Sequence, residues 1–186
     1  MTYGSKLDGI DIRDLTLFDL REQIGFVQQE PFLFNGTVRQ NLSYGRLDAT
    51  QERIEAVARA AQAHSFIQGL PEGYDTWLGE RGVKLSVGQK QRMAIARVLL
   101  KDPPIVVMDE ATSNIDTETE VEIRLAMDAL MQGRTTFVIA HRLSTLQTVD
   151  RIVVLQNGEI LEEGTHEGLL AKGGLYAGLY EAQFQA

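Results

Sequence analysis

The chain has 186 residues, enough for one domain with a hydrophobic core, and its 44% hydrophobic and 24% charged residues are typical of a globular protein. No apolar run approaches the ~18 residues of a membrane span, and the absence of cysteine excludes disulfides and cysteine-ligated metals. The net charge of −8, with basic residues scattered along the chain, argues against a nucleic-acid partner.

The first half of the chain is predicted to be mainly helical after one short strand at residues 24–29. A single amphipathic helix is predicted from Thr50 to about Gln68, because four apolar residues recur there with helical spacing. These residues are Ile54, Val57, Ala58 and Ala61. Asp48 and Gln51 form a possible capping box at the start of this helix.

A second helix is predicted at residues 86–100, where Ser86 and Gln89 form an S-x-x-Q capping box. The amides of Val87 and Gly88 then lie at a helix start, where the helix dipole favours an anion such as phosphate. Gly88 has no side chain, so a ligand could approach its backbone, and the Ser86 hydroxyl could donate to a phosphate oxygen. An ordinary helix cap is the alternative interpretation.

Strands and helices alternate in the second half, which indicates a parallel α/β sheet. Asn157-Gly158 predicts a hairpin. The predicted elements are a strand at 105–108, a helix at 118–131, strands at 135–140 and 151–155, and a helical tail at 167–183 interrupted by Gly173-Gly174.

Two adjacent carboxylates, Asp109 and Glu110, follow the apolar strand at 105–108. They are therefore expected at the carboxyl end of a buried parallel strand, the edge at which open α/β sheets bind ligands. One carboxylate could hold Mg²⁺ and the other could orient or deprotonate an attacking water. A strand that simply enters a polar loop is the alternative.

Six segments in one order resemble the motifs of ATP-binding cassette (ABC) ATPases, and the resemblance extends from about Leu7 to the end of the chain. The segments are VQQEPFLF (Q-loop), TWLGERG (the segment before the signature in exporters), LSVGQKQR (signature), IVVMDE (Walker B), SNID (D-loop) and AHRLST (histidine switch). The signature departs from its usual form, LSGGQ, because Val87 stands in place of the first glycine.

The resemblance implies a role for each matching residue. Glu110 would polarise the attacking water, His141 would reach the γ-phosphate, and Gln29 with Asp109 would hold Mg²⁺. The remaining residues would contact the nucleotide of a second, head-to-tail cassette: Ser86, Val87, Gly88, Gln89 and Asp116. ATP and Mg²⁺ are the implied cofactors.

The Walker A loop, G-x-x-x-x-G-K-[ST], is not found in the 186 residues. The chain has five lysines, and none of them follows a glycine. The resemblance therefore implies an N-terminally truncated P-loop NTPase-type α/β fold, which lacks a central strand and exposes apolar sheet surface. The expected parts are a core remnant with the Q-loop at 1–37, a helical subdomain at 38–101, and the rest of the core at 102–186.

The sequence thus predicts part of the nucleotide-binding domain of an ABC exporter, which couples ATP hydrolysis to transmembrane export. Its expected partners are a second cassette and membrane domains, and its expected place is the cytosolic face of the membrane. The isolated chain is expected to be inactive as an ATPase. A non-catalytic cassette that donates its signature helix to an intact partner is an alternative, which stimulation of that partner's ATPase would support. A DNA-repair ABC ATPase is opposed by the absence of sustained heptads.

Overall fold

The computed structural model describes residues 5–82, 84–109, 116–140 and 146–184. The chain divides into two compact units, residues 1–139 and residues 140–186, and each is described by itself. None of the described helices is long and apolar enough to cross a membrane.

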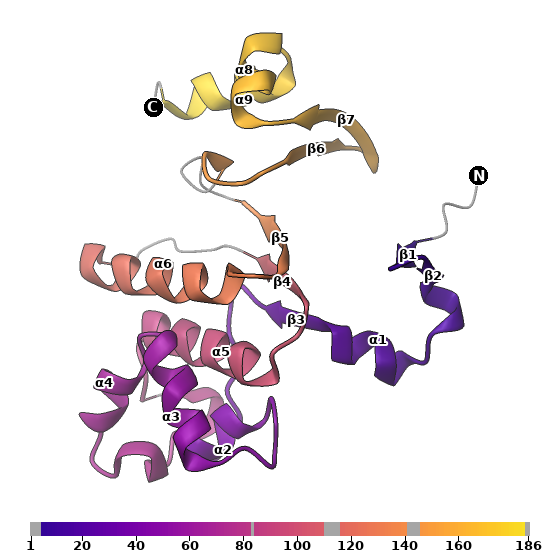
Figure 1. Cartoon of the computed structure of the whole chain (residues 1–186). Helices are drawn as coiled ribbons and strands as arrows, with labels where there is room; N and C mark the ends of the chain where they lie inside the picture. Colours follow the sequence, from indigo (N-terminus) through magenta and orange to yellow (C-terminus); the bar gives the residue numbers. More distant parts are fainter. Residues whose placement is uncertain (1–4, 83, 110–115, 141–145, 185–186) are drawn as a thin grey trace. The chain divides into compact units, whose positions relative to one another are not determined.

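The first unit contains a three-stranded sheet, a set of helices and a short N-terminal hairpin (Figure 1). Its elements in chain order are β1 (Lys6–Leu7), β2 (Ile10–Asp11), η1 (Ile12–Asp14), α1 (Leu17–Gln23), β3 (Ile24–Val27), α2 (Val38–Ser43), α3 (Gln51–Ala60), α4 (His64–Gln68), η2 (Gly73–Asp75), η3 (Glu80–Gly82), α5 (Val87–Lys101), β4 (Ile105–Asp109), α6 (Thr117–Met131) and β5 (Thr135–Ile139).

The sheet is parallel, with the strand order β3-β4-β5, which confirms the predicted α/β class. Alternate residues of β3 and β4 are buried, and those of β5 are half-buried. Helix α5 packs against this face of the sheet, since a side chain at Gly25 would overlap Val98 of α5. The opposite face carries the row Phe26, Val107 and Phe137, in which the two phenylalanines are about half exposed. One face of the sheet is thus packed and the other is apolar and exposed.

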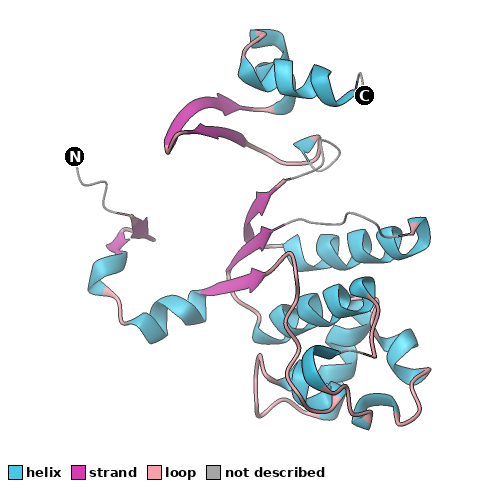
Figure 2. Cartoon of the chain, turned by 180° about the vertical axis from the view of Figure 1, so that it is seen from behind, coloured by secondary structure: helices cyan, strands magenta, loops and turns pink. Residues whose placement is uncertain are grey.

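The predicted helix from Thr50 to Gln68 is wrong in one respect: the segment forms two helices, α3 and α4 (Figure 2). Gln62 adopts a left-handed conformation with φ 54°, and the Ala63 amide donates to the Ala58 carbonyl at 2.7 Å. This is the 6→1 hydrogen bond of a Schellman motif, which ends α3. The predicted apolar face is confirmed, since Ile54, Ala58 and Ala61 are buried and Val57 packs against them.

The start of α3 also differs from the expected capping box at Asp48. Thr50 is the N-cap, and its Oγ1 accepts a hydrogen bond from the Arg53 amide at 3.4 Å. Threonine is a favoured N-cap residue because its hydroxyl satisfies one of the unpaired amides of the first turn. A polar residue two positions later than expected therefore starts the helix.

Helix α5 lies at the centre of the first unit and packs against α2, α3, α6 and β3. Most residues of α5 are buried, and its apolar side chains form part of the core of the first unit. Arg92 is buried among them. The prediction of this helix and of its Ser86–Gln89 capping box is confirmed. The predicted domain boundaries at residues 37 and 101 stay a prediction.

The second unit is an antiparallel hairpin followed by two helices. Its elements are β6 (Ile152–Gln156), β7 (Glu159–Gly164), α8 (His166–Lys172) and α9 (Leu175–Phe184). The predicted hairpin is confirmed: Asn157 and Gly158 both have positive φ, 52° and 82°, as a two-residue turn of this type requires. The predicted helical tail is also confirmed, with its interruption at Gly173.

Candidate functional site

The carboxyl ends of β3, β4 and β5 lie at one edge of the sheet. Met108 is paired with Val27 on one side and with Val138 on the other, and Asp109 is paired with Ile139. Gln29 follows β3 by two residues and is exposed. The structure therefore brings Asp109 and the loop of Gln29 to the same edge, as the sequence predicts for a ligand site.

Two of the predicted catalytic residues lie outside the described part of the chain. Glu110 directly follows Asp109, and His141 comes two residues after the end of β5. A cluster of three or more His, Cys, Asp or Glu side chains that could hold a metal is not found among the described residues. An aspartate carboxylate and a glutamine amide oxygen are nevertheless hard oxygen ligands, and Mg²⁺ uses only one or two carboxylates beside phosphate oxygens. The donor chemistry of these two residues suits Mg²⁺, and their joint binding of the ion stays a prediction.

The segment after Gln29 is held by the buried side chain of Asn41 in α2. Its Oδ1 accepts a hydrogen bond from the Phe34 amide at 2.7 Å, and its Nδ2 donates to the carbonyls of Phe34 and Thr37, both at 3.0 Å. Asn41 is 1% exposed, so these hydrogen bonds replace those that the amide would make with water. The backbone of this segment is fixed to the helices.

Arg97 of α5 binds both this segment and Asn41. Its guanidinium donates to the Phe32 carbonyl at 3.1 Å, to the Asn41 carbonyl at 3.0 Å and to Asn41 Oδ1 at 3.2 Å. The group also lies over the rings of Phe34 and Tyr44. Burial lowers the pKa of Arg97 to about 10, so the side chain remains a cation at neutral pH. The sequence analysis did not single out Arg97. Its place as the one charged residue in the apolar run 93–100 could have indicated a buried structural role.

The start of α5 has the geometry that the capping box predicts. Ser86 Oγ accepts a hydrogen bond from the Gln89 amide at 3.2 Å, and the Ser86 amide donates to Gln89 Oε1 at 3.0 Å. The Ser86 hydroxyl hydrogen is not used by the cap, so it can be donated to a ligand. The Val87 side chain is 60% exposed. The Gln89 side-chain oxygen is engaged in the cap, while its role toward a nucleotide stays a prediction.

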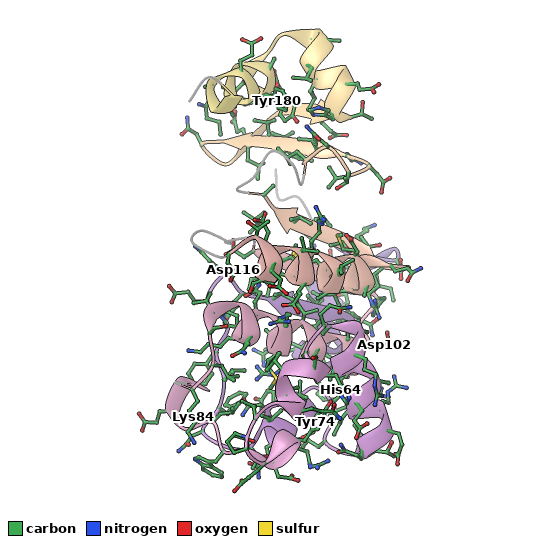
Figure 3. All side chains as sticks on the ribbon, turned by 90° about the vertical axis from the view of Figure 1, so that its left-hand side faces the viewer. His64, Tyr74, Lys84, Asp102, Asp116 and Tyr180 are labelled. Atoms are coloured by element: carbon green, nitrogen blue, oxygen red, sulfur yellow. The ribbon has the colours of Figure 1, made fainter. Side chains whose placement is uncertain are left out.

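Asp116 is the N-cap of α6 (Figure 3), and its Oδ1 accepts a hydrogen bond from the Thr119 amide at 2.9 Å. Hydrogen bonds from the Thr119 amide and then from the Thr119 hydroxyl lower the pKa of Asp116 below its ordinary value. The carboxylate therefore stays charged at neutral pH. Its predicted contact with a second cassette stays a prediction.

Arg92 is a further residue that sequence reasoning missed. It is 5% exposed, and its Nη1 lies 2.5 Å from Glu122 Oε2 of α6 and donates to the Gln62 carbonyl at 2.8 Å. Its guanidinium also stacks over the Phe66 ring at 5.0 Å. Burial lowers the pKa of Arg92, and the charge of Glu122 opposes that shift. Arg92 ties the start of α5 to α6 and to the turn between α3 and α4.

Comparison with known proteins gives consistent results. A family model described as "ABC transporter" matches residues 2–113. An ATP-dependent lipid A-core flippase from Syntrophus aciditrophicus (strain SB) is 58% identical over 179 residues, which are 96% of this chain and 30% of that protein. A putative multidrug export ATP-binding/permease protein from Staphylococcus aureus (strain bovine RF122 / ET3-1) is 54% identical over 177 residues, 95% of this chain and 31% of that protein.

Among solved structures, a bacterial Atm1-family ABC exporter with ATP bound is similar, with a TM-score of 0.88 and 48% sequence identity. The match covers 96% of this chain and 31% of that exporter. The chain thus spans about a third of the length of the proteins it resembles.

Proposed function

Because the chain belongs to the ABC transporter family, we propose that it forms most of the ATP-binding cassette of an exporter and acts in ATP hydrolysis coupled to transport. The observation that carries the proposal is the shared carboxyl edge of β3, β4 and β5. It brings Asp109 and the Gln29 loop together, and Glu110 follows Asp109 directly.

In the proposed mechanism, Asp109 and Gln29 would supply oxygen ligands to Mg²⁺. The bound ion would neutralise charge on the phosphate oxygens of ATP. Glu110 would orient a water molecule and accept its proton, and His141 would interact with the γ-phosphate. Asp109 and Glu110 thus divide the two tasks, metal binding and water activation, between adjacent positions.

A second cassette is the proposed partner at the start of α5. The Ser86 hydroxyl and the Val87 and Gly88 amides would face the γ-phosphate of the nucleotide held by that partner, with Gln89 and Asp116 beside them. The capped helix start supports this, because its free amides and dipole attract an anion. Val87 in place of glycine adds an exposed apolar side chain at this surface.

Membrane domains are the second proposed partner, which would place the cassette at the cytosolic face of a membrane. Large apolar side chains are exposed around the helices of the first unit. They include Phe32, Tyr44, Leu47 and Trp77, each at least 49% exposed. Two of them, Phe32 and Tyr44, lie against the Phe34 ring, and exposed apolar side chains that gather in this way are typical of interaction sites.

The cassette needs a phosphate-binding loop that the 186 residues do not contain. We therefore propose that these residues alone bind ATP weakly and hydrolyse it negligibly. Without the loop, the β- and γ-phosphates lose the backbone amides and the lysine that would hold them against Asp109 and Glu110.

The test is to extend the chain at its N-terminus with an upstream cassette segment that carries the G-x-x-x-x-G-K-[ST] loop. The extended protein is expected to hydrolyse Mg²⁺-ATP. Glu110→Gln in it is expected to lower the rate by about 10²–10⁴-fold, because the general base is lost, with little effect on ATP binding. Glu52→Gln, an exposed glutamate in the first turn of α3, is the matched control and should leave the rate unchanged. A Glu110→Gln variant that retains the full rate would refute the proposed role.

A further inference from the structure

The first turns of α5 and α6 touch at Gly88 and Thr119. A Cβ atom built at Gly88 would overlap Thr119 Cγ2 and would lie 3.6 Å from Ile123 Cδ1. Gly88 is buried and its φ is not in the left-handed region, so its backbone conformation does not require glycine. The space beside it is filled by a side chain of α6, so any larger residue at position 88 would overlap Thr119.

Thr119 also holds Asp116, the N-cap of α6. The Thr119 amide donates to Asp116 Oδ1 at 2.9 Å. After this amide, the Thr119 side chain is the next largest cause that lowers the pKa of the Asp116 carboxyl. One residue therefore makes two separate kinds of contact. Its methyl group packs on Gly88, and its polar groups orient Asp116.

A second contact one turn further along the helices fixes their relative position. Arg92 of α5 pairs with Glu122 of α6 at 2.5 Å, and Arg92 Nε donates to the Gly88 carbonyl at 3.4 Å. These two contacts, in successive turns, join the first halves of α5 and α6. Ser86 and Asp116, 30 positions apart in the sequence, are the N-caps of these two helices.

We propose that Thr119 is a positioning residue that joins the helix start at Ser86 and the carboxylate of Asp116 into one rigid body. Its methyl group sets the distance between the two helix starts at Gly88, and its hydroxyl holds the Asp116 side chain. That this body faces the nucleotide of a second cassette rests on the proposed function; the positioning itself does not. Gly88 is then required by Thr119, whose methyl group fills the space that a side chain at position 88 would need.

The first part of the test measures unfolding of the 186-residue chain without nucleotide. Gly88→Ala is expected to lower the midpoint of thermal unfolding by roughly 3–10 °C, because it overpacks the contact with Thr119. Thr119→Ser removes Cγ2 and keeps the hydroxyl, so the double variant Gly88→Ala/Thr119→Ser is expected to recover more than half of the loss. If Gly88→Ala alone does not fold, folding of the double variant is the rescue. A double variant no better than Gly88→Ala would overturn the proposal.

The second part separates the hydroxyl of Thr119 from its methyl group. Thr119→Val keeps a methyl group toward Gly88 and removes the hydroxyl, so the pKa of Asp116 is expected to rise toward its ordinary value, whereas Thr119→Ser should leave it lowered. Nuclear magnetic resonance of the aspartate carboxyl carbons would measure this, with Asp75, whose carboxylate is bonded to Arg39, as the unaffected reference. An Asp116 pKa equal in both variants would contradict the positioning role. Neither part uses ATP, so failure here is distinct from failure of the proposed function.

Discussion

Replacement of Arg97 with methionine is expected to lower the free energy of unfolding of the first unit by about 2–4 kcal/mol. Methionine keeps much of the apolar stem but removes every donor of the guanidinium. The carbonyls of Phe32 and Asn41 and the Asn41 side-chain oxygen then lose the partners that they have at 3.0–3.2 Å. Two of these three hydrogen bonds are partly buried, and removal of the donor there leaves an acceptor that water replaces only in part.

The effect should be measured by urea unfolding, with Arg39→Met as the matched control. Arg39 pairs with Asp75 at 3.0 Å, but the carboxylate is largely exposed, so loss of this ion pair is expected to have little effect. Arg97→Lys should lie between the wild type and Arg97→Met, because a lysine keeps the charge but reaches fewer of the acceptors. Equal stability of Arg97→Met and Arg39→Met would show that the Arg97 contacts do not stabilise the fold.

Replacement of Gly174 with alanine is expected to destabilise the second unit by about 2–4 kcal/mol. Glu162 is 9% exposed, and its carboxylate accepts hydrogen bonds from the amides of Leu175 and Tyr176, both at 2.9 Å. It therefore caps the start of α9. A Cβ atom at Gly174 would overlap Glu162 Oε1, so alanine would displace the carboxylate from its amides.

The matched control is in the same helix and is expected to have the opposite sign. A Cβ atom at Gly178 would have no neighbour within 4 Å, so Gly178→Ala should stabilise α9 by about 0.5–1 kcal/mol through helix propensity alone. Hydrogen exchange of the α9 amides would measure the stability of this helix in both variants. The method suits this unit because its buried cluster among the described residues is small, with Ile152, Leu169 and Tyr176. Protection that is unchanged in Gly174→Ala would contradict the proposed cap.

The features that the sequence predicted correctly depend on local interactions. The Ser86–Gln89 capping box and the Asn157-Gly158 turn each need only residues within a few positions of one another, so their signals lie in a short stretch of sequence. The parallel strands were also predicted, because a buried strand is marked by its own apolar run. The resemblance to a known family then supplied the site residues, of which Glu110 and His141 lie outside the described part of the chain.

The features that were missed depend on contacts between distant segments. The helix break at Gln62 has neither glycine nor proline to mark it, and its carbonyl accepts a hydrogen bond from Arg92, 30 positions away. Arg97 fixes a segment more than 60 positions before it. The packing of Thr119 against Gly88 was also missed, because these two residues are 31 positions apart. Helical periodicity shows which residues face inward but not which side chains they meet.

The central claim is that the chain carries the residues for ATP chemistry but needs a phosphate-binding loop from elsewhere. The most direct test is the rate of Mg²⁺-ATP hydrolysis by the purified 186-residue chain, measured beside the N-terminally extended form under the same conditions. The expected result is a background rate for the 186-residue chain and clear turnover for the extended form. A rate of the chain alone within about tenfold of the extended form, a barrier difference of only ~1.4 kcal/mol, would contradict the claim.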